Sequence, residues 1–233
     1  MNDFMSGKLK KAITFSYDDG VVQDIKLIDL MAKYGIKATF NLNSELLGKG
    51  GILHRPSYNI CHYKILPGDV RELYQGHEIA AHTLTHPDLR KLSDEEVIRQ
   101  AEQDRLNLSE LAGYDVVGMA YPGGHHDARL AKLLRENTGI RYSRTIDNNQ
   151  SFDVQENLYQ FNPTEFHLHY DSMFALAERF LAMKPEKPQI FYIWGHAFEQ
   201  DMGNDRWARL EEFFQHISGH DDIFYGTNRE VLL

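Results

Sequence analysis

Cysteine and long hydrophobic runs are nearly absent from this sequence. The chain has 233 residues and one cysteine, Cys61, so no internal disulfide can form, and the fold does not depend on an oxidising compartment. Cys61 has no partner motif nearby and is expected to be an incidental thiol. No apolar stretch approaches the roughly 20 residues of a membrane helix. The first residues also lack the basic start, apolar core and cleavage site of a secretory signal, which predicts a cytoplasmic protein without a membrane span.

Positive charge is also in short supply. The chain has 25 Lys and Arg against 34 Asp and Glu, a formal net charge of −9, which repels a phosphate backbone and argues against a nucleic-acid partner. The remaining composition, 42% hydrophobic and 25% charged residues, is that of a globular protein. The length suits one domain covering residues 1–233.

Short β-rich runs alternate with longer amphipathic segments, which predicts an α/β fold with parallel strands joined by helices. The clearest helix begins after Ser93, which can cap it together with Glu96, and ends at Gly113. Two long connections, 48–67 and 147–166, are expected to be loops that shape a cleft. Strands are expected at 12–16, 38–42, 78–81, 116–121, 141–145, 189–194 and 223–225, and helices at 23–34, 68–74, 93–111, 128–137, 172–183 and 205–217.

Four polar clusters follow predicted strands. Because the carboxyl ends of parallel strands share one edge of a sheet, these clusters are expected to meet there. The first is the acidic pair Asp18-Asp19 before Gly20. Neighbouring side chains at a strand end point in different directions, so one carboxylate can bind a cation while the other faces water on that cation. Alone, this pattern is typical of a turn.

The second cluster is His82-Thr83-Leu84-Thr85-His86. Histidines four residues apart lie on one face of a helical turn, within reach of one metal ion. Together with Asp19 they make three protein ligands, which leaves a position open for water, as catalytic metal sites require. The sequence therefore predicts a catalytic metal site.

The third and fourth clusters add a turn and an imidazole. Tyr121-Pro122-Gly123-Gly124 is either an ordinary turn or a source of backbone N–H groups for a developing oxyanion. Trp194-Gly195-His196 brings His196 to the same edge, where the glycine would permit close approach of a ligand. His196 is either a structural residue or a proton donor, and we favour the second.

In order and spacing, the four clusters resemble the motifs of the polysaccharide deacetylase family, the NodB-homology domain of carbohydrate esterase family four. The segments TFSYDDG and HTLTH carry the resemblance most specifically, and it extends over residues 12–196. It implies a distorted (β/α) barrel of about seven parallel strands. It also implies a hydrolase that removes acetyl groups, usually from N-acetylglucosamine polymers or acetylated xylan.

The resemblance also assigns roles. Asp18 corresponds to the general base and His196 to the general acid, while Asp19, His82 and His86 correspond to the metal ligands. The donor set suits Zn²⁺, with Co²⁺, Mn²⁺ or Ni²⁺ as alternatives.

The substrate side of the site is assigned in the same way. The N–H of Gly123, after Tyr121 and Pro122, matches the family's oxyanion donor. Trp194 stands where the family often has leucine, and is either a wall for the acyl group or a packed core aromatic.

The sequence departs from the family at two positions. The arginine that pairs with the catalytic base is replaced by Ala120, and we expect Arg144 to supply the guanidinium instead. The family's fourth motif is missing, and Asp147 is a candidate to orient His196. Other polar residues are expected to be surface, supporting or rim groups: His125, His126, His167, His169, Glu199 and Asp201.

Several functions remain open at this point. The first is deacetylation of N-acetyl or O-acetyl groups on a carbohydrate. The second, suggested by the missing secretion signal, is a cytoplasmic deacylase of a small N-acyl compound. The third is a catalytically impaired sugar-binding module. A non-haem iron oxygenase also uses two His and one carboxylate, but such sites usually lie on β barrels rather than in alternating α/β folds.

Overall fold

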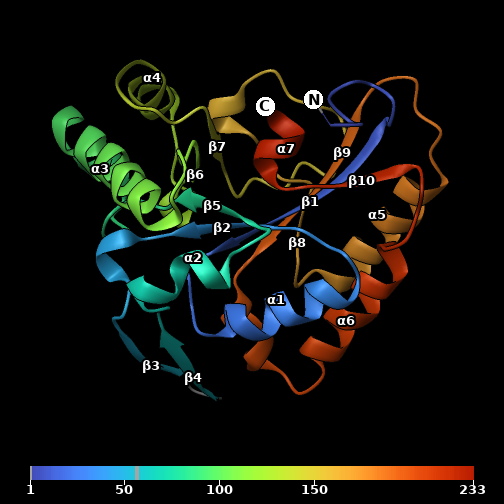
Figure 1. Cartoon of the computed structure of the whole chain (residues 1–233), viewed down its shortest axis with the longest axis horizontal. Coiled ribbons are helices and arrows are strands. Elements are labelled where there is room, and N and C mark those ends of the chain that lie inside the picture. Colours follow the sequence, from blue (N-terminus) through green and yellow to red (C-terminus); the bar gives the residue numbers. More distant parts are fainter. Residues whose placement is uncertain (1, 56–57) are drawn as a thin grey trace.

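One curled sheet of parallel strands runs through the centre of the protein, with helices around it (Figure 1). The computed structural model describes residues 2–55 and 58–233. Along the main path the strand order is β7-β6-β5-β2-β1-β9-β8. The ends of this path, β7 and β8, do not pair with each other in the described part of the chain, so the barrel is incomplete. The strands are β1 (Lys11–Asp18), β2 (Thr39–Leu42), β5 (Glu78–Ala81), β6 (Gly118–Ala120), β7 (Tyr142–Arg144), β8 (Glu165–Phe166), β9 (Gln189–Gly195) and β10 (Ile223–Tyr225).

The central strand β1 is buried along its whole length, because neighbours cover both of its edges. One edge pairs with β9 from Lys11 to Tyr17. The other edge is divided between β10, which pairs with residues 11–13, and β2, which pairs with residues 16–18. The strand therefore ends at Asp18 in the middle of the sheet.

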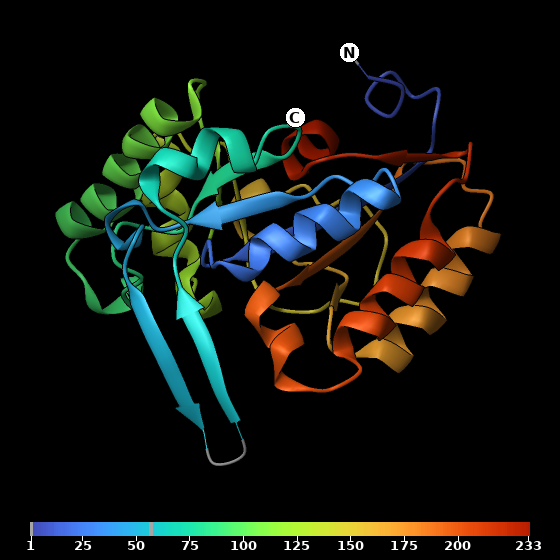
Figure 2. The ribbon, with the colours of Figure 1, turned by 60° about the horizontal axis from the view of Figure 1, so that its bottom comes forward.

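Helices pack against this sheet through their apolar stripes. The helix α3 begins after Ser93, whose hydroxyl accepts the N–H of Glu96, and ends at Gly113 in the left-handed conformation. It lies beside α4 at one end of the sheet, while α5 and α6 lie together at the other (Figures 1 and 2). The helices are α1 (Gln23–Lys33), α2 (Val70–Leu73), α3 (Asp94–Ala112), α4 (Ala128–Asn137), α5 (Tyr170–Ala182), α6 (Arg206–Ile217) and α7 (Asn228–Leu232).

A two-stranded hairpin stands out from the body of the protein (Figure 2). Its strands, β3 (Gly50–Arg55) and β4 (Tyr58–Tyr63), pair antiparallel and form a separate sheet. This hairpin occupies the first of the two segments that were expected to be loops.

The predicted α/β fold with parallel strands is confirmed, and all seven predicted strands and six predicted helices are present. The structure adds the hairpin, the short strand β8 and the last helix α7. The assignment of one domain to the whole chain stays a prediction.

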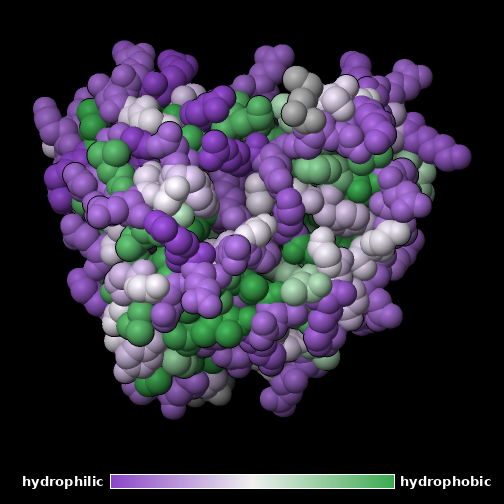
Figure 3. Space-filling model, viewed as in Figure 1, coloured by the Kyte–Doolittle hydropathy of each residue, from purple (hydrophilic) through white to green (hydrophobic). Residues whose placement is uncertain are grey.

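No helix among the described residues is both long and apolar enough to cross a bilayer. On the face shown in Figure 3, hydrophilic side chains predominate, with hydrophobic ones in small groups between them.

Candidate active site

The predicted site residues gather at the carboxyl edge of the sheet. Asp18 is the last residue of β1, and His82 directly follows β5. Arg144 ends β7, and His196 follows β9. Since neighbouring strands of the main sheet run parallel, these ends lie on the same side of the molecule.

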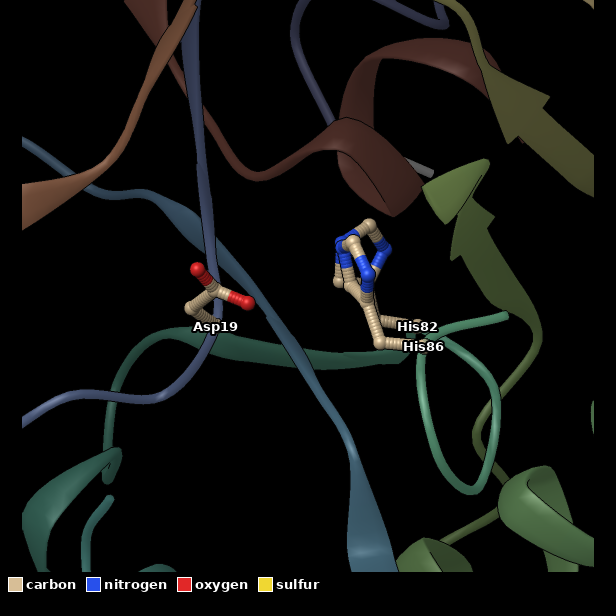
Figure 4. Close-up of side chains that lie close together, drawn as sticks. All are labelled: Asp19, His82 and His86. Atoms are coloured by element: carbon tan, nitrogen blue, oxygen red, sulfur yellow. The ribbon is translucent and has the colours of Figure 1, made fainter. Parts of the chain in front are cut away.

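Asp19, His82 and His86 form a compact group of side chains with the geometry to hold a metal ion. One ligand atom from each lies within 4.8 Å of those from the other two. Figure 4 shows the carboxylate of Asp19, from the end of β1, across from the two imidazoles, which rise from one loop. Asp19 and His86 both have left-handed backbones, with φ of 84° and 59°. Such conformations in non-glycine residues cost energy and cluster at functional sites.

The structure corrects how the two histidines come together. Residues 82–86 form an irregular loop rather than a helical turn, with Thr83 at φ 67°. The side chain of Asn43 donates to the carbonyl oxygens of His82 and Thr83, and the His86 N–H donates to the Thr83 hydroxyl. These bonds fix the loop so that the imidazole centroids lie 4.8 Å apart.

His82 is held in the form that a metal ligand needs. Its Nδ1 lies 2.8 Å from the carbonyl oxygen of Ala120, which leaves Nε2 directed to the site. Burial lowers the pKa of His82 to about 4, so the ring is neutral at physiological pH. A neutral imidazole with one nitrogen anchored is the usual ligand state.

Asp18 is a buried carboxylate with a cationic partner. Arg144 donates from Nη2 to both of its oxygens, and the Asn41 amide donates to Oδ1 at 2.8 Å. Burial alone would raise the pKa of Asp18, but Arg144, His82 and His196 outweigh it and hold that pKa below its usual value. Asp18 is therefore ionised at neutral pH.

The sheet register explains how Arg144 reaches this carboxylate. Arg144 of β7 is the register partner of Ala120 on β6. Side chains at paired positions of neighbouring strands lie on the same face, roughly 5 Å apart. A guanidinium one strand away therefore arrives beside Asp18, and Ala120 takes up little of the space between them.

The side chain of Trp194 is largely buried. Its exposed fraction is 8%, its indole N–H donates to Asn148 at 2.8 Å, and the Arg144 guanidinium lies 4.8 Å from the ring centroid. A role of Trp194 as a wall for the acyl group stays a prediction.

Glu199 is the acidic partner of His196. Its Oε2 lies 3.1 Å from His196 Nδ1 and accepts the His196 backbone N–H at 3.0 Å. The same oxygen lies 2.8 Å from Nε2 of the fully buried His167. Burial alone would lower the pKa of His196, but Glu199 above all, with Asp18 and Asp19, raises it to about 9.

These contacts correct three predictions. Glu199 is not a rim charge. Asp147 does not approach His196; it turns away to His126, 2.9 Å distant, with 63% of its side chain exposed. The space beside Gly195 is taken by the His167 ring rather than by a ligand. The signal for Glu199 was its place three residues after His196, the spacing of a capping box.

The turn at residues 122–124 keeps a candidate oxyanion donor. The N–H groups of Gly124 and His125 are used within the turn, at 2.9 Å to Tyr121 O and 3.2 Å to Pro122 O. Neither bond takes up the N–H of Gly123, whose left-handed backbone (φ 58°) suits glycine. Tyr121 is buried and its hydroxyl donates to the Tyr159 carbonyl, so only its backbone lies at the turn.

A pocket of about 360 Å³ opens beside the candidate metal site, with Asp19 and His86 in its lining. Two of its side chains, neither of which the sequence indicated, contact Asp19. Lys64 Nζ lies 3.1 Å from Oδ1, and His62 Nε2 lies 3.3 Å from Oδ2. Burial alone would raise the pKa of Asp19, but these partners lower it well below its usual value. The pocket is lined by Asp19, Leu46, Lys49, Gly50, His62, Lys64 and His86.

An incomplete α/β barrel with two acids, a pair of histidines and a further imidazole at its carboxyl edge defines a hydrolase-type site. A family model described as polysaccharide deacetylase matches residues 6–143, more than half of the chain. The chain therefore belongs to the polysaccharide deacetylase family, whose members act as carbohydrate deacetylases.

The relatives agree with this assignment. A peptidoglycan-N-acetylglucosamine deacetylase from Listeria monocytogenes is 27% identical over 130 residues, which are 54% of this chain and 24% of the relative. The chain thus matches about a quarter of that protein's length.

Solved structures show the same fold. The carbohydrate esterase domain of a xylanase from the hindgut metagenome of Trinervitermes trinervoides has a TM-score of 0.60 at 17% identity, covering 95% of this chain and 89% of that one. A family 4 carbohydrate esterase from Streptomyces lividans, solved with acetate, has a TM-score of 0.58 at 14% identity, covering 94% and 93%.

Proposed function

We propose that the protein is a metal-dependent hydrolase that removes acetyl groups from a carbohydrate. The main support for this proposal is the group of Asp19, His82 and His86, whose ligand atoms lie within 4.8 Å of one another. Family membership and the N-acetylglucosamine deacetylase from Listeria support an N-acetylated sugar as substrate, with an O-acetyl ester as the alternative.

The donor set fits a divalent transition metal. Two imidazoles and one carboxylate are the ligands of many catalytic zinc sites, and Co²⁺, Mn²⁺ or Ni²⁺ accept the same set. The anchored, neutral ring of His82 supports this assignment. Once bound, such a cation polarises the acyl carbonyl and makes water more acidic.

Asp18 then acts as the general base. Arg144 and Asn41 hold its carboxylate and keep it ionised, so it can take a proton from the water that adds to the acetyl carbonyl carbon. The Gly123 N–H stabilises the negative charge that develops on the carbonyl oxygen. In this assignment Arg144 is a positioning residue.

His196 acts as the general acid. Its raised pKa keeps the ring protonated at neutral pH, with the Glu199 carboxylate 3.1 Å from Nδ1 and Asp18 Oδ2 3.9 Å from Nε2, the nitrogen we assign to proton donation. When the bond between the acetyl carbon and the sugar nitrogen breaks, this proton passes to the leaving amine and acetate is released.

A deacylase of a small N-acyl compound is the second candidate. The pocket of about 360 Å³ is at the lower end of the range for small-molecule sites.

The test combines metal analysis with acetate release. We expect the purified protein to hold about one divalent metal per chain, to lose acetate release after chelation, and to regain it with metal. The panel contains N-acetylated and O-acetylated sugars and small N-acyl compounds. Protein that neither binds nor responds to metal would refute the mechanism.

One variant separates the two acids. Asp18→Asn should keep the metal and lose about a hundredfold or more in turnover. If it instead lost the metal and recovered turnover after reloading, the roles of Asp18 and Asp19 would be reversed.

A further inference from the structure

Two lysines lie at the base of the β3–β4 hairpin and line the same pocket. Next to the last pair of the hairpin, Gly50 with Tyr63, the Lys64 N–H donates to the Lys49 carbonyl at 2.7 Å. The chain therefore brings two positive charges to one side of the pocket, where they repel each other.

The two lysines have too little negative charge near them. Lys64 is 7% exposed and its only ion-pair partner within the described residues is Asp19. Lys49 is exposed and pairs with no carboxylate in residues 2–55 and 58–233. Asp19 is also the single carboxylate of the pocket's described lining.

In the proposed function, Asp19 is also a ligand of the divalent cation. Its negative charge is then divided between the cation and Lys64. The pocket then has an excess of positive charge, in a protein whose net charge is −9. A buried cation needs a counter-charge, and here a bound ligand is the group that can supply it.

We infer that Lys49 and Lys64 form an anion-binding subsite, so that the substrate is an acetylated sugar with a carboxylate or phosphate group near its acetyl group. This inference rests on the proposed function. The two lysines and the metal ligands line the same pocket of about 360 Å³, so one sugar residue can reach both.

The test compares N-acetylglucosamine with three anionic forms: its 6-phosphate, its 6-carboxylate and its 3-O-lactyl ether. Both acetate release and binding to the protein, by calorimetric titration, are measured at constant ionic strength. We expect at least one anionic sugar to exceed the neutral sugar about tenfold in kcat/KM and in affinity, as charge-assisted hydrogen bonds predict. The preferred anion identifies the group as carboxylate or phosphate.

The variant is Lys49→Glu, because Lys49 is exposed and, unlike Lys64, does not contact a metal ligand. It should reduce the preference for the anionic sugar at least tenfold. The control, Lys184→Glu, makes the same charge change in the exposed segment before β9, at the opposite end of that strand from His196, and should leave the preference unchanged.

Two kinds of failure are distinguishable. Hydrolysis of the neutral sugar with no anion preference, or an equal loss for neutral and anionic sugars in Lys49→Glu, overturns the subsite and leaves the deacetylase proposal intact. Absence of acetate release from every substrate overturns the deacetylase proposal, and the binding measurements then decide the subsite by themselves.

Discussion

Arg144 approaches Asp18 from a strand next to the one on which the family's arginine is expected. Its sheet partner is Ala120, the residue that stands in the family's arginine position. Arg144 is 1% exposed and makes three further kinds of contact, with Ser16, with the Thr145 carbonyl and with the ring of Trp194. The guanidinium is thus fixed in place as well as charged.

We predict that Arg144→Ala reduces turnover about ten- to a hundredfold, since a hydrogen bond to a charged group contributes about 1.5–3 kcal/mol. The pKa of Asp18, which Arg144 lowers, should rise. Because the proposed mechanism needs ionised Asp18, the acidic limb of the pH–rate profile should move to higher pH. Arg141→Ala, on the exposed start of the same segment, is the control. Normal turnover with an unchanged profile would show that Arg144 has no such role.

Glu199 acts on the opposite limb of the profile. It raises the pKa of His196, the proposed general acid, to about 9, so this ring stays protonated until the pH rises through that value. In Glu199→Gln the negative charge is gone, and the alkaline limb should move to lower pH, with reduced kcat at neutral pH. The profile of kcat against pH measures this shift.

Asp201→Asn provides the matched control for Glu199. It removes the same charge two residues away, but Asp201 contacts Gln23 and Trp207 rather than His196. Equal shifts in both variants would indicate a general effect of charge, and no shift in Glu199→Gln would contradict the positioning role.

Sequence reasoning found the residues that carry a spaced motif and missed those that do not. Four site residues were identifiable because they are acids and histidines, with the spacing of metal ligands, that directly follow predicted strands: Asp18, Asp19, His82 and His86. Lys64 and His62 belong to no motif, and their approach to Asp19 depends on how a hairpin folds back onto the sheet. Residue spacing does not contain that information.

Among the elements, the parallel strands and the long helices were predictable, and the hairpin was not. The strands of the main sheet are bounded by turn signals, and α3 has a capping residue at one end and a glycine at the other. In β4, Ile60 is the one fully buried position, so the hairpin lacks the apolar alternation by which strands are recognised.

The loop that carries His82 and His86 shows a different limit. A spacing of four residues predicts proximity on a helix, and the side chains are indeed close, but the backbone takes left-handed turns at Thr83 and His86. Contacts from Asn43, distant in sequence, stabilise that path. The spacing correctly predicted that the two imidazoles lie close together. It wrongly predicted a helical backbone between them.

For the molecule as a whole, a buried acid links stability to pH. Asp24 is fully buried; its Oδ2 accepts the Tyr74 hydroxyl at 2.7 Å, while Oδ1 has no partner among the described residues. Burial raises the pKa of Asp24 to about 8. The folded protein therefore binds this proton more tightly than the unfolded chain does. Its contribution to stability is present at low pH and is lost as the pH rises from about 4 to about 8.

We predict that Asp24→Asn flattens this decline, because the amide is neutral at every pH and can still accept from Tyr74. Over that pH range, the free energy of unfolding of the wild type should fall by several kcal/mol more than that of Asp24→Asn, at about 1.4 kcal/mol per pH unit. Urea unfolding at a series of pH values measures it. Asp29→Asn, an exposed position on the same helix, is the control. Equal pH dependence in the wild type and Asp24→Asn would contradict the prediction.

The divided edge of β1 bears on the order in which the protein is built. β1 is synthesised before β9 and β10, yet one of its edges pairs with β9 and part of the other pairs with β10. Pairing between such distant segments is slow, and unpaired strands expose a nascent chain to aggregation. Asp18 and His196 come together only when β9 docks on β1, so the proposed catalytic pair cannot form before residues 189–195 have been synthesised.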